Sequence, residues 1–319
     1  MNRTFLIFAA CFAFSFPFRT SSAQAKVWQP SPGHTQVAIW PGTPPNAQPV
    51  PGPEYVQRVG EGPPGAEVEH NISRPTMTVY SPEGNSNGVA VVVFPGGGFQ
   101  GLYMDLEGTE VCDWLTSKGI TCVVLKYRVP SLPYDWHCDC RPHNQMISTL
   151  SLEDAQRTMG LVRLHAAEWH IDPHKIGVLG FSAGGYLVAE ISTNYKRRLY
   201  KPVDAADKES CRPDFAVAVY PGHLWVNSPD YKLNPNVPVT RQTPPTFLVQ
   251  AEDDNIDGIN QALTYFITLK NAGVPAELHI YAHGGHGFGL RHTNLPITDW
   301  PQLVEKWLGT IGMVSTSAQ

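Results

Sequence analysis

The sequence lacks the features of several large classes of protein. Only 16% of its 319 residues are charged, the formal net charge is −5, and no block of Lys and Arg occurs. This argues against a nucleic acid or an anionic membrane surface as a partner. Beyond residue 25, no stretch is long and apolar enough to cross a bilayer, and no internal repeat of fixed period is visible. We therefore expect a soluble mature protein with one large α/β domain or two smaller ones.

The first 25 residues have the pattern of a cleavable signal peptide. Arg3 supplies a positive charge, residues 5–18 are apolar but short for a membrane span, and Ala23-Gln24-Ala25 is a cleavage site before Lys26. The alternative is an uncleaved anchor. We expect a secreted or periplasmic protein, and hence an oxidising compartment.

Cysteine is scarce, with six residues in the chain. Cys11 leaves with the signal peptide, and the odd number of the rest leaves at least one thiol unpaired in a monomer. Two are expected to be buried thiols, Cys112 in a helix and Cys122 in an apolar strand. The pairing of Cys138, Cys140 and Cys211 stays open.

The rest of the chain divides into an arm, a domain and a tail. Residues 26–67 are rich in Pro and Gly and are expected to form an extended arm on the domain, and residues 314–319 form a tail. Within 68–313, strands are predicted at 69–80, 89–94, 121–128, 176–181, 214–220, 246–250 and 276–282. Helices are predicted at 107–118, 152–170, 186–195, 260–271 and 297–311. This alternation predicts an α/β fold with a mostly parallel central sheet and helices on both faces.

One stretch predicts the chemistry. The apolar run 176–181 ends in Gly180-Phe181-Ser182-Ala183-Gly184 and passes directly into a helix. A strand–Gly-x-Ser-x-Gly–helix arrangement is a nucleophile elbow, in which a sharp turn exposes the serine at a helix N-terminus. Gly84-Asn85-Ser86-Asn87-Gly88 matches the same pattern, but it precedes a strand and has the composition of a surface turn. Ser182 is therefore the predicted nucleophile.

A serine nucleophile needs a base and an acid, and both should follow the elbow in loops after strands. His286 lies among glycines after the strand 276–282, whereas Asp253 and Asp254 follow the strand 246–250. Because the carboxyl ends of parallel strands meet at one edge of a sheet, these loops are expected to reach Ser182. Either aspartate fits the position of the acid.

The oxyanion of an acyl-transfer reaction also needs donors. The N–H of Ala183 is one candidate, and the turn with Gly97 and Gly98 after the strand 89–94 is another. Residues 96–101 also match the dinucleotide pattern G-x-G-x-x-G, but the next strand ends without an acidic residue for a ribose. We predict no cofactor. Residues 137–143 contain His and Cys, but in a spacing that matches no common zinc motif, so no metal is predicted.

With these motifs, the chain resembles the α/β-hydrolases, in particular the esterase and lipase-like branch that includes bacterial acetylxylan esterases. The likeness runs from about Val68 to Met313 and is carried by residues 94–99, 180–185 and 284–289. It implies a triad of Ser182, His286 and an acid after the strand 246–250. In relatives the acid commonly precedes a proline, and Asp254 occupies that place with Asn255 instead, so Asp254 is the predicted acid and Asp253 the alternative. A second departure is Pro95, where many lipases have a histidine.

The resemblance implies an exported serine carboxylesterase that removes small acyl groups, notably acetyl, from xylan or a related plant polysaccharide. Its partner is then an acylated carbohydrate substrate. Four aromatic side chains are candidates for contact with sugar rings: Phe99, Tyr103, Trp136 and Trp225. The alternatives are a feruloyl esterase, a serine exopeptidase of the prolyl-oligopeptidase type, for which the arm is short, and an inactive fold that only binds carbohydrate.

Overall fold

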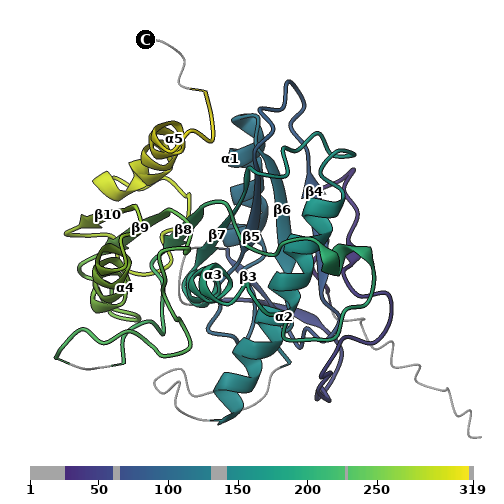
Figure 1. The fold of residues 1–319 in the computed structure, drawn as a ribbon. Coiled ribbons are helices and arrows are strands. Elements are labelled where there is room, and N and C mark those ends of the chain that lie inside the picture. The colour runs from purple at the N-terminus through teal and green to yellow at the C-terminus, as the bar shows by residue number, and fades with distance from the viewer. Residues whose placement is uncertain (1–25, 60–64, 131–141, 227–228, 316–319) are drawn as a thin grey trace, which may run out of the picture.

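A computed structural model describes residues 26–59, 65–130, 142–226 and 229–315. Within these ranges, eight strands form one sheet in the order β1-β4-β6-β5-β7-β8-β9-β10 (Figure 1). The six strands β6, β5, β7, β8, β9 and β10 run parallel, whereas β4 is antiparallel to both of its neighbours, β6 and the edge strand β1. The predicted α/β-hydrolase fold, with its mostly parallel sheet, is confirmed.

The parallel strands are short and apolar because helices cover both of their faces. They are β5 (Ala90–Phe94), β6 (Thr121–Lys126), β7 (Ile176–Phe181), β8 (Ala216–Val219), β9 (Thr246–Ala251) and β10 (Ala276–Tyr281). Every residue of β5 to β9 is buried, while β10 at the edge is partly exposed. The carboxyl ends of these strands lie along one rim of the sheet.

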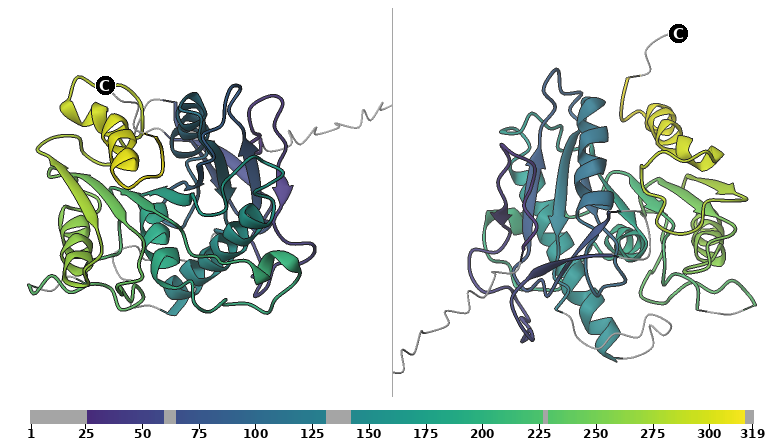
Figure 2. Two further views of the ribbon diagram at one scale, coloured as in Figure 1. Left: turned by 45° about the horizontal axis from the view of Figure 1, so that its top comes forward. Right: turned by 180° about the vertical axis from the view of Figure 1, so that it is seen from behind.

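The helices form two layers. On one face lie α1 (Glu110–Ser117) and α5 (Trp300–Thr310), and on the other lie α2 (Pro142–Leu164), α3 (Ala183–Thr193) and α4 (Asn260–Asn271) (Figure 1). Figure 2 shows the last two strands between α5 and α4. Trp114 of α1 packs against Trp300 of α5, with ring centroids 5.6 Å apart. None of the described helices has the length and apolar character needed to span a membrane.

Two predicted elements differ from those observed. The single strand expected at 69–80 is two strands, β3 (Glu67–His70) and β4 (Thr76–Tyr80), because Asn71 has a left-handed backbone (φ 59°) and Pro75 precedes β4. The helix expected at 152–170 begins ten residues earlier and ends at Leu164. Within α2 the charged residues Asp154 and Arg157 are buried, which apolar spacing does not predict.

The arm is joined to the domain by strands and by a buried polar contact. β1 (Val37–Ala38) pairs with β4 of the main sheet, and β2 (Tyr55–Arg58) pairs with β3. The indole Nε1 of Trp40 donates to Asp154 Oδ1 (2.8 Å), which also accepts from Arg128. The arm therefore shares the core that α2 and β6 form.

The expectation that Cys112 and Cys122 are buried free thiols is wrong, because they form a disulfide between α1 and β6 with Cα atoms 5.1 Å apart. α1 packs directly on β6, which brings the two positions together. Cys211 is a buried free thiol whose Sγ donates to the carbonyl of Tyr195. Cys138 and Cys140 lie outside the described residues.

Candidate active site

Ser182 lies at a strained turn between β7 and α3. Its backbone has φ 51° and ψ −119°, values that a residue with a side chain rarely adopts. A Cβ on Gly180 would lie 2.2 Å from the carbonyl oxygen of Gly184, and one on Gly184 would lie 2.0 Å from that of Phe94. Both glycines are therefore required for the turn that exposes Ser182. Ser86, by contrast, lies in the surface turn before β5.

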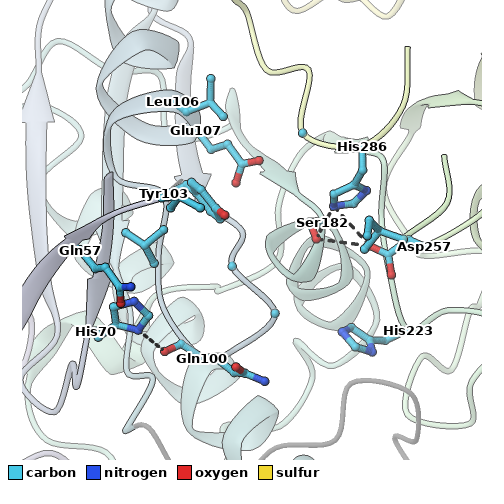
Figure 3. Close-up of a pocket in the computed structure, with 16 residues that line it drawn as sticks. Gln57, His70, Gln100, Tyr103, Leu106, Glu107, Ser182, His223, Asp257 and His286 are labelled. Carbon is cyan, nitrogen blue, oxygen red and sulfur yellow. Dashed lines mark hydrogen bonds and ion pairs between the residues drawn. The ribbon is translucent and has the colours of Figure 1, made fainter. Parts of the chain in front are cut away.

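Three side chains from three loops meet at the rim of the sheet, and Figure 3 shows two of them, Ser182 and His286. Ser182 Oγ is 3.0 Å from His286 Nε2, and His286 Nδ1 is 2.8 Å from Asp254 Oδ2. The serine follows β7, the aspartate follows β9 and the histidine follows β10. A hydroxyl, an imidazole and a carboxylate in this chain of contacts can activate the hydroxyl as a nucleophile.

Asp254 is held as an ionised acceptor. Its side chain is fully buried, and its Oδ1 accepts from the backbone N–H groups of Ile256 (2.9 Å) and Asp257 (3.1 Å). Burial opposes ionisation, but the hydrogen bond and charge of His286 and the two N–H groups outweigh it and lower the pKa of Asp254. The carboxylate can therefore stabilise a positively charged imidazole.

The pKa of His286 also results from opposing effects of burial and neighbouring charges. Burial favours the neutral ring, but the hydrogen bond to Asp254 and the charges of Asp257, Asp254 and Glu107 raise the pKa of His286 above its ordinary value. A base with a raised pKa holds the proton of a serine more firmly once it has taken it.

The neighbouring Asp253 has a different position. Its carboxylate accepts from His283 Nδ1 (3.2 Å) and from the N–H groups of Gly284 (2.9 Å) and Gly285 (2.7 Å). Of the two aspartates, Asp254 contacts His286. Asp253 instead binds the backbone of Gly284 and Gly285 in the loop that carries His286, which we call the histidine loop.

The glycine turn after β5 packs directly on the elbow. A Cβ on Gly96 would lie 2.9 Å from Ser182 Cβ, and Gly97 (φ 136°) and Gly98 (φ 61°) have positive φ. Gly97 and Gly98 line the same pocket as Ser182. Ala183 is the first residue of α3, where N–H groups lack a helical partner. This is the arrangement expected of an oxyanion site.

Glu107 is a buried carboxyl that sequence analysis missed. It belongs to a short π-helical segment, Asp105–Thr109, that precedes α1. Glu107 Oε2 accepts from the N–H of Gly96 (2.6 Å), and Oε1 accepts from the hydroxyl of Tyr220 (2.8 Å). The Tyr220 ring packs 4.9 Å from His286, and its oxygen accepts from Gly289 N–H (3.3 Å). Glu107 thus connects the glycine turn to the histidine loop.

Burial raises the pKa of Glu107 to about 7, against the opposing effect of its hydrogen bonds with Tyr220 and Gly96. A carboxyl of this kind titrates near neutral pH. The signal that could have identified it is weak, because a Glu in a helical stretch is ordinarily a solvated surface residue.

The pocket in front of Ser182 has a volume of about 670 Å³. It is lined by residues of the triad loops, the glycine turn and the arm: Gln57, Val59, Val68, His70, Gly97, Gly98, Gln100, Tyr103, Leu106, Glu107, Ser182, His223, Ile256, Asp257, His286 and Gly287. A cavity of this size accommodates a small organic molecule.

The four aromatic candidates have different positions. Tyr103 lines the pocket, but Phe99 does not. Phe99 is 1% exposed and packs in the core against Tyr127 and Tyr186, so the expectation that it contacts substrate is wrong. Phe99 directly follows the two positive-φ glycines and itself has φ 54°, and in this turn its side chain packs inward. Trp225 is half-buried and not among the lining residues, and Trp136 lies outside the described residues.

The strand β2 of the arm and its partner β3, at the start of the domain, form one wall of this pocket, which sequence analysis did not anticipate. Gln57 on β2 and Val68 and His70 on β3 face the cavity (Figure 3). His70 Nδ1 lies 3.0 Å from the carbonyl oxygen of Gln100, beside the glycine turn. The antiparallel pairing of β2 with β3, the next strand along the chain, brings these residues to the pocket.

The described residues contain no group of three His, Cys, Asp or Glu side chains that could hold a metal ion. The segment 137–143, which contains His and Cys, lies for the most part outside them. The G-x-G-x-x-G stretch at 96–101 is the glycine turn beside Ser182.

The fold and this arrangement of residues define an α/β-hydrolase. Residues 112–310 match the model of the prolyl oligopeptidase family, so the chain belongs to that family. A solved structure, the acetyl ester-xyloside bifunctional hydrolase from Caldicellulosiruptor lactoaceticus, is similar with a TM-score of 0.68 and 31% identity. That likeness covers 88% of this chain and 97% of the other.

Two curated relatives are longer than this chain. The acetylxylan esterase of Xylanibacter ruminicola is 31% identical over 235 residues, which are 67% of this chain and 43% of the relative. Endo-1,4-beta-xylanase B of Butyrivibrio fibrisolvens is 24% identical over 230 residues, 67% of this chain and 34% of the relative. The aligned region thus spans less than half the length of either relative.

Proposed function

We propose that this protein is a serine carboxylesterase that hydrolyses small acyl esters, notably acetyl esters on xylan or a related plant polysaccharide. The observation that carries the proposal is the contact chain of Ser182, His286 and Asp254, with distances of 3.0 and 2.8 Å. The relatives named as acetylxylan esterase and acetyl ester-xyloside hydrolase support the acetyl ester as substrate.

The proposed reaction is a two-step acyl transfer. Ser182 Oγ attacks the ester carbonyl while His286 Nε2 takes its proton and Asp254 stabilises the charged ring. The N–H groups of Ala183 and of the Gly97–Gly98 turn stabilise the oxyanion. His286 then gives the proton to the leaving alcohol, and an acyl group remains on Ser182. Water, deprotonated by His286, releases the acid and restores the serine.

The size of the pocket supports a substrate with a bulky alcohol part. An acetyl group fills only a small fraction of about 670 Å³. The wall opposite the triad carries Gln57, Gln100 and Tyr103, which are neutral hydrogen-bonding groups of the kind that sugar hydroxyls need. The remaining space suits the sugar from which the acetyl group is removed.

A substrate panel tests this function and separates its alternatives. We expect hydrolysis of acetylated xylan and of short p-nitrophenyl esters, with activity falling as the acyl chain lengthens. Ser182→Ala should lower kcat/KM by about a thousandfold or more. Preference for feruloylated oligosaccharide would indicate a feruloyl esterase. Preference for aminoacyl p-nitroanilides would indicate the peptidase activity that the family name suggests, and either result would contradict the proposal.

We also propose that the protein is exported after removal of residues 1–25. The disulfide between Cys112 and Cys122 supports an oxidising compartment, because such bonds are rare in the reducing cytosol. Expression of the full chain in a bacterial host and N-terminal sequencing of the exported protein should give Lys26 as the first residue. Recovery of a membrane-bound protein that starts at Met1 would indicate an uncleaved anchor instead.

A further inference from the structure

Asp257 is a third carboxylate at the site, and the mechanism above gives it no task. It lies in the loop after β9, its side chain is 8% exposed, and it lines the pocket. Asp257 Oδ2 accepts from Ser182 Oγ at 3.3 Å and lies 3.7 Å from His286 Nε2 (Figure 3). It therefore faces the two atoms between which the proton of the reaction moves.

The backbone is built to admit this side chain. A Cβ on Gly222 would lie 2.5 Å from Asp257 Oδ1 and 2.8 Å from its Cγ. Only glycine at position 222 leaves room for the carboxylate beside the elbow. The N–H of Gly222 in turn donates to the carbonyl oxygen of Ser182 (3.2 Å), so the loop that admits Asp257 is also tied to the nucleophile.

Ser182 Oγ carries one proton and faces two acceptors. In the reactive arrangement the hydroxyl proton of Ser182 points to His286 Nε2. Asp257 Oδ2 then lies next to Ser182 Oγ but receives no hydrogen bond from it. Among the described residues, the contact from Ser182 is the one hydrogen bond found for the Asp257 side chain. A buried carboxylate without a donor is costly, and burial raises the pKa of Asp257 accordingly. Because Asp257 lines the pocket, as His223 does, a hydroxyl that enters with the substrate can supply such a donor.

The position of that donor follows from the reaction. His286 Nε2 protonates the leaving oxygen, so this oxygen lies close to Nε2 when the ester bond breaks. Asp257 Oδ2 is 3.7 Å from the same nitrogen. A donor within hydrogen-bond reach of Asp257 can therefore lie about 3 Å from the leaving oxygen, which is the separation of the two oxygens of a vicinal diol.

We propose that Asp257 is a specificity-determining residue that accepts a hydrogen bond from the hydroxyl adjacent to the ester, so that the site selects monoesters of vicinal diols such as partly acetylated sugars. The inference rests on the proposed esterase function. Gln57, Gln100 and Tyr103, which also line the pocket, are neutral hydrogen-bonding groups suited to the other hydroxyls of a polyhydroxy alcohol.

Two simple esters test the inference. The probes are the monoacetate of trans-1,2-cyclohexanediol, in which acyl migration regenerates the same compound, and cyclohexyl acetate, which lacks the hydroxyl. Each kcat/KM is divided by the rate constant of hydroxide-catalysed hydrolysis of the same ester, which removes the intrinsic effect of the hydroxyl. The wild type should prefer the diol monoacetate by about tenfold or more, as expected for a hydrogen bond to a charged acceptor.

Substitution of Asp257 should remove this preference. In Asp257→Val the ratio should fall to about one, and Asp257→Asn should give an intermediate ratio because the amide is a weaker acceptor. The matched control is Glu252→Gln, which changes an exposed carboxylate of the same loop and should keep the wild-type ratio.

Two results would overturn the inference: a wild-type ratio near one, or an unchanged ratio in folded Asp257→Val. If Asp257→Val does not fold, the wild-type ratio still decides. Ser182→Ala separates this inference from the function on which it rests. Hydrolysis of both esters by Ser182→Ala would remove the proposed function itself. A required Ser182 together with an unmoved ratio would remove only the role of Asp257.

Discussion

Three aspartates within five positions of one loop have three different surroundings. Asp253 is exposed and accepts from the histidine loop, Asp254 is fully buried against His286, and Asp257 faces Ser182 from inside the pocket. A carboxylate acquires its task from its neighbours and its burial rather than from its type. The loop after β9 therefore sets the charge around the triad.

The pair Asp253 and Asp254 gives a matched comparison. In Asp254→Asn the amide cannot hold the charged ring, so kcat should fall by about a thousandfold to ten-thousandfold. In Asp253→Asn the fall should be about tenfold or less, because the backbone N–H groups of the loop keep an oxygen acceptor. Steady-state kinetics with p-nitrophenyl acetate measure both. A larger loss in Asp253→Asn than in Asp254→Asn would show that the wrong aspartate has been assigned as the acid.

The pH profile should report the charge around His286. The neutral ring is the base, so kcat/KM should rise with pH through the pKa of His286, which lies above the ordinary value of 6.5. The charge of Asp257 is one cause of this rise, so Asp257→Asn should move the acid limb to lower pH. The measurement is kcat/KM between pH 5 and 9 for both proteins. A limb that moves to higher pH in the variant would contradict this account.

At the scale of elements, the ends of the strands place the triad, and local signals predict them well. Ser182 could be identified because a strand, two glycines and a helix start are adjacent in sequence, and His286 because its glycines follow a strand. Glu107 and Asp257 could not be identified in this way. Each makes a contact with a residue far along the chain, Glu107 with Tyr220 and Asp257 with Ser182.

Glu107, in the π-helical segment before α1, should make the free energy of unfolding depend on pH. The pKa of Glu107 rises from 4.5 to about 7 on folding, so the folded state holds this proton more tightly than the unfolded state. Its contribution is fully present below pH 4.5 and is lost as pH rises through 7. By linkage the loss is about 3 kcal/mol, and Glu107→Gln should not show it.

Urea unfolding at several pH values measures this difference. The gap in free energy of unfolding between Glu107→Gln and the wild type should shift in favour of the variant between pH 4.5 and 8. A gap that is constant over this range would mean that Glu107 is ionised in the folded protein throughout.

At the scale of the whole molecule, the arm is part of both the core and the pocket. Its composition predicted an extended segment on the domain, but composition does not predict which side chains it buries. Trp28, Ile39 and Trp40 are all buried, and Gln57 reaches the cavity. The disulfide between α1 and β6 escaped prediction for a similar reason, since helix-on-strand packing decides whether two thiols meet.

The hydrogen bond from Trp40 to Asp154 allows a test of whether the arm and the domain unfold together. Trp40→Phe keeps an aromatic ring but removes the donor to a buried carboxylate, which should lower the free energy of unfolding by about 1–3 kcal/mol. Unfolding followed by tryptophan fluorescence and by circular dichroism should stay a single transition. Two separate transitions, or no loss of stability, would mean that the arm folds apart from the domain.

The proposed hydrolysis requires that Ser182 becomes acylated. A fluorophosphonate that mimics the tetrahedral intermediate should inactivate the wild type, and mass spectrometry should find one adduct per chain on the peptide that contains Ser182. Ser182→Ala should take up none under the same conditions. An adduct on any other residue that accounts for the loss of activity, or full activity with Ser182 modified, would contradict the account.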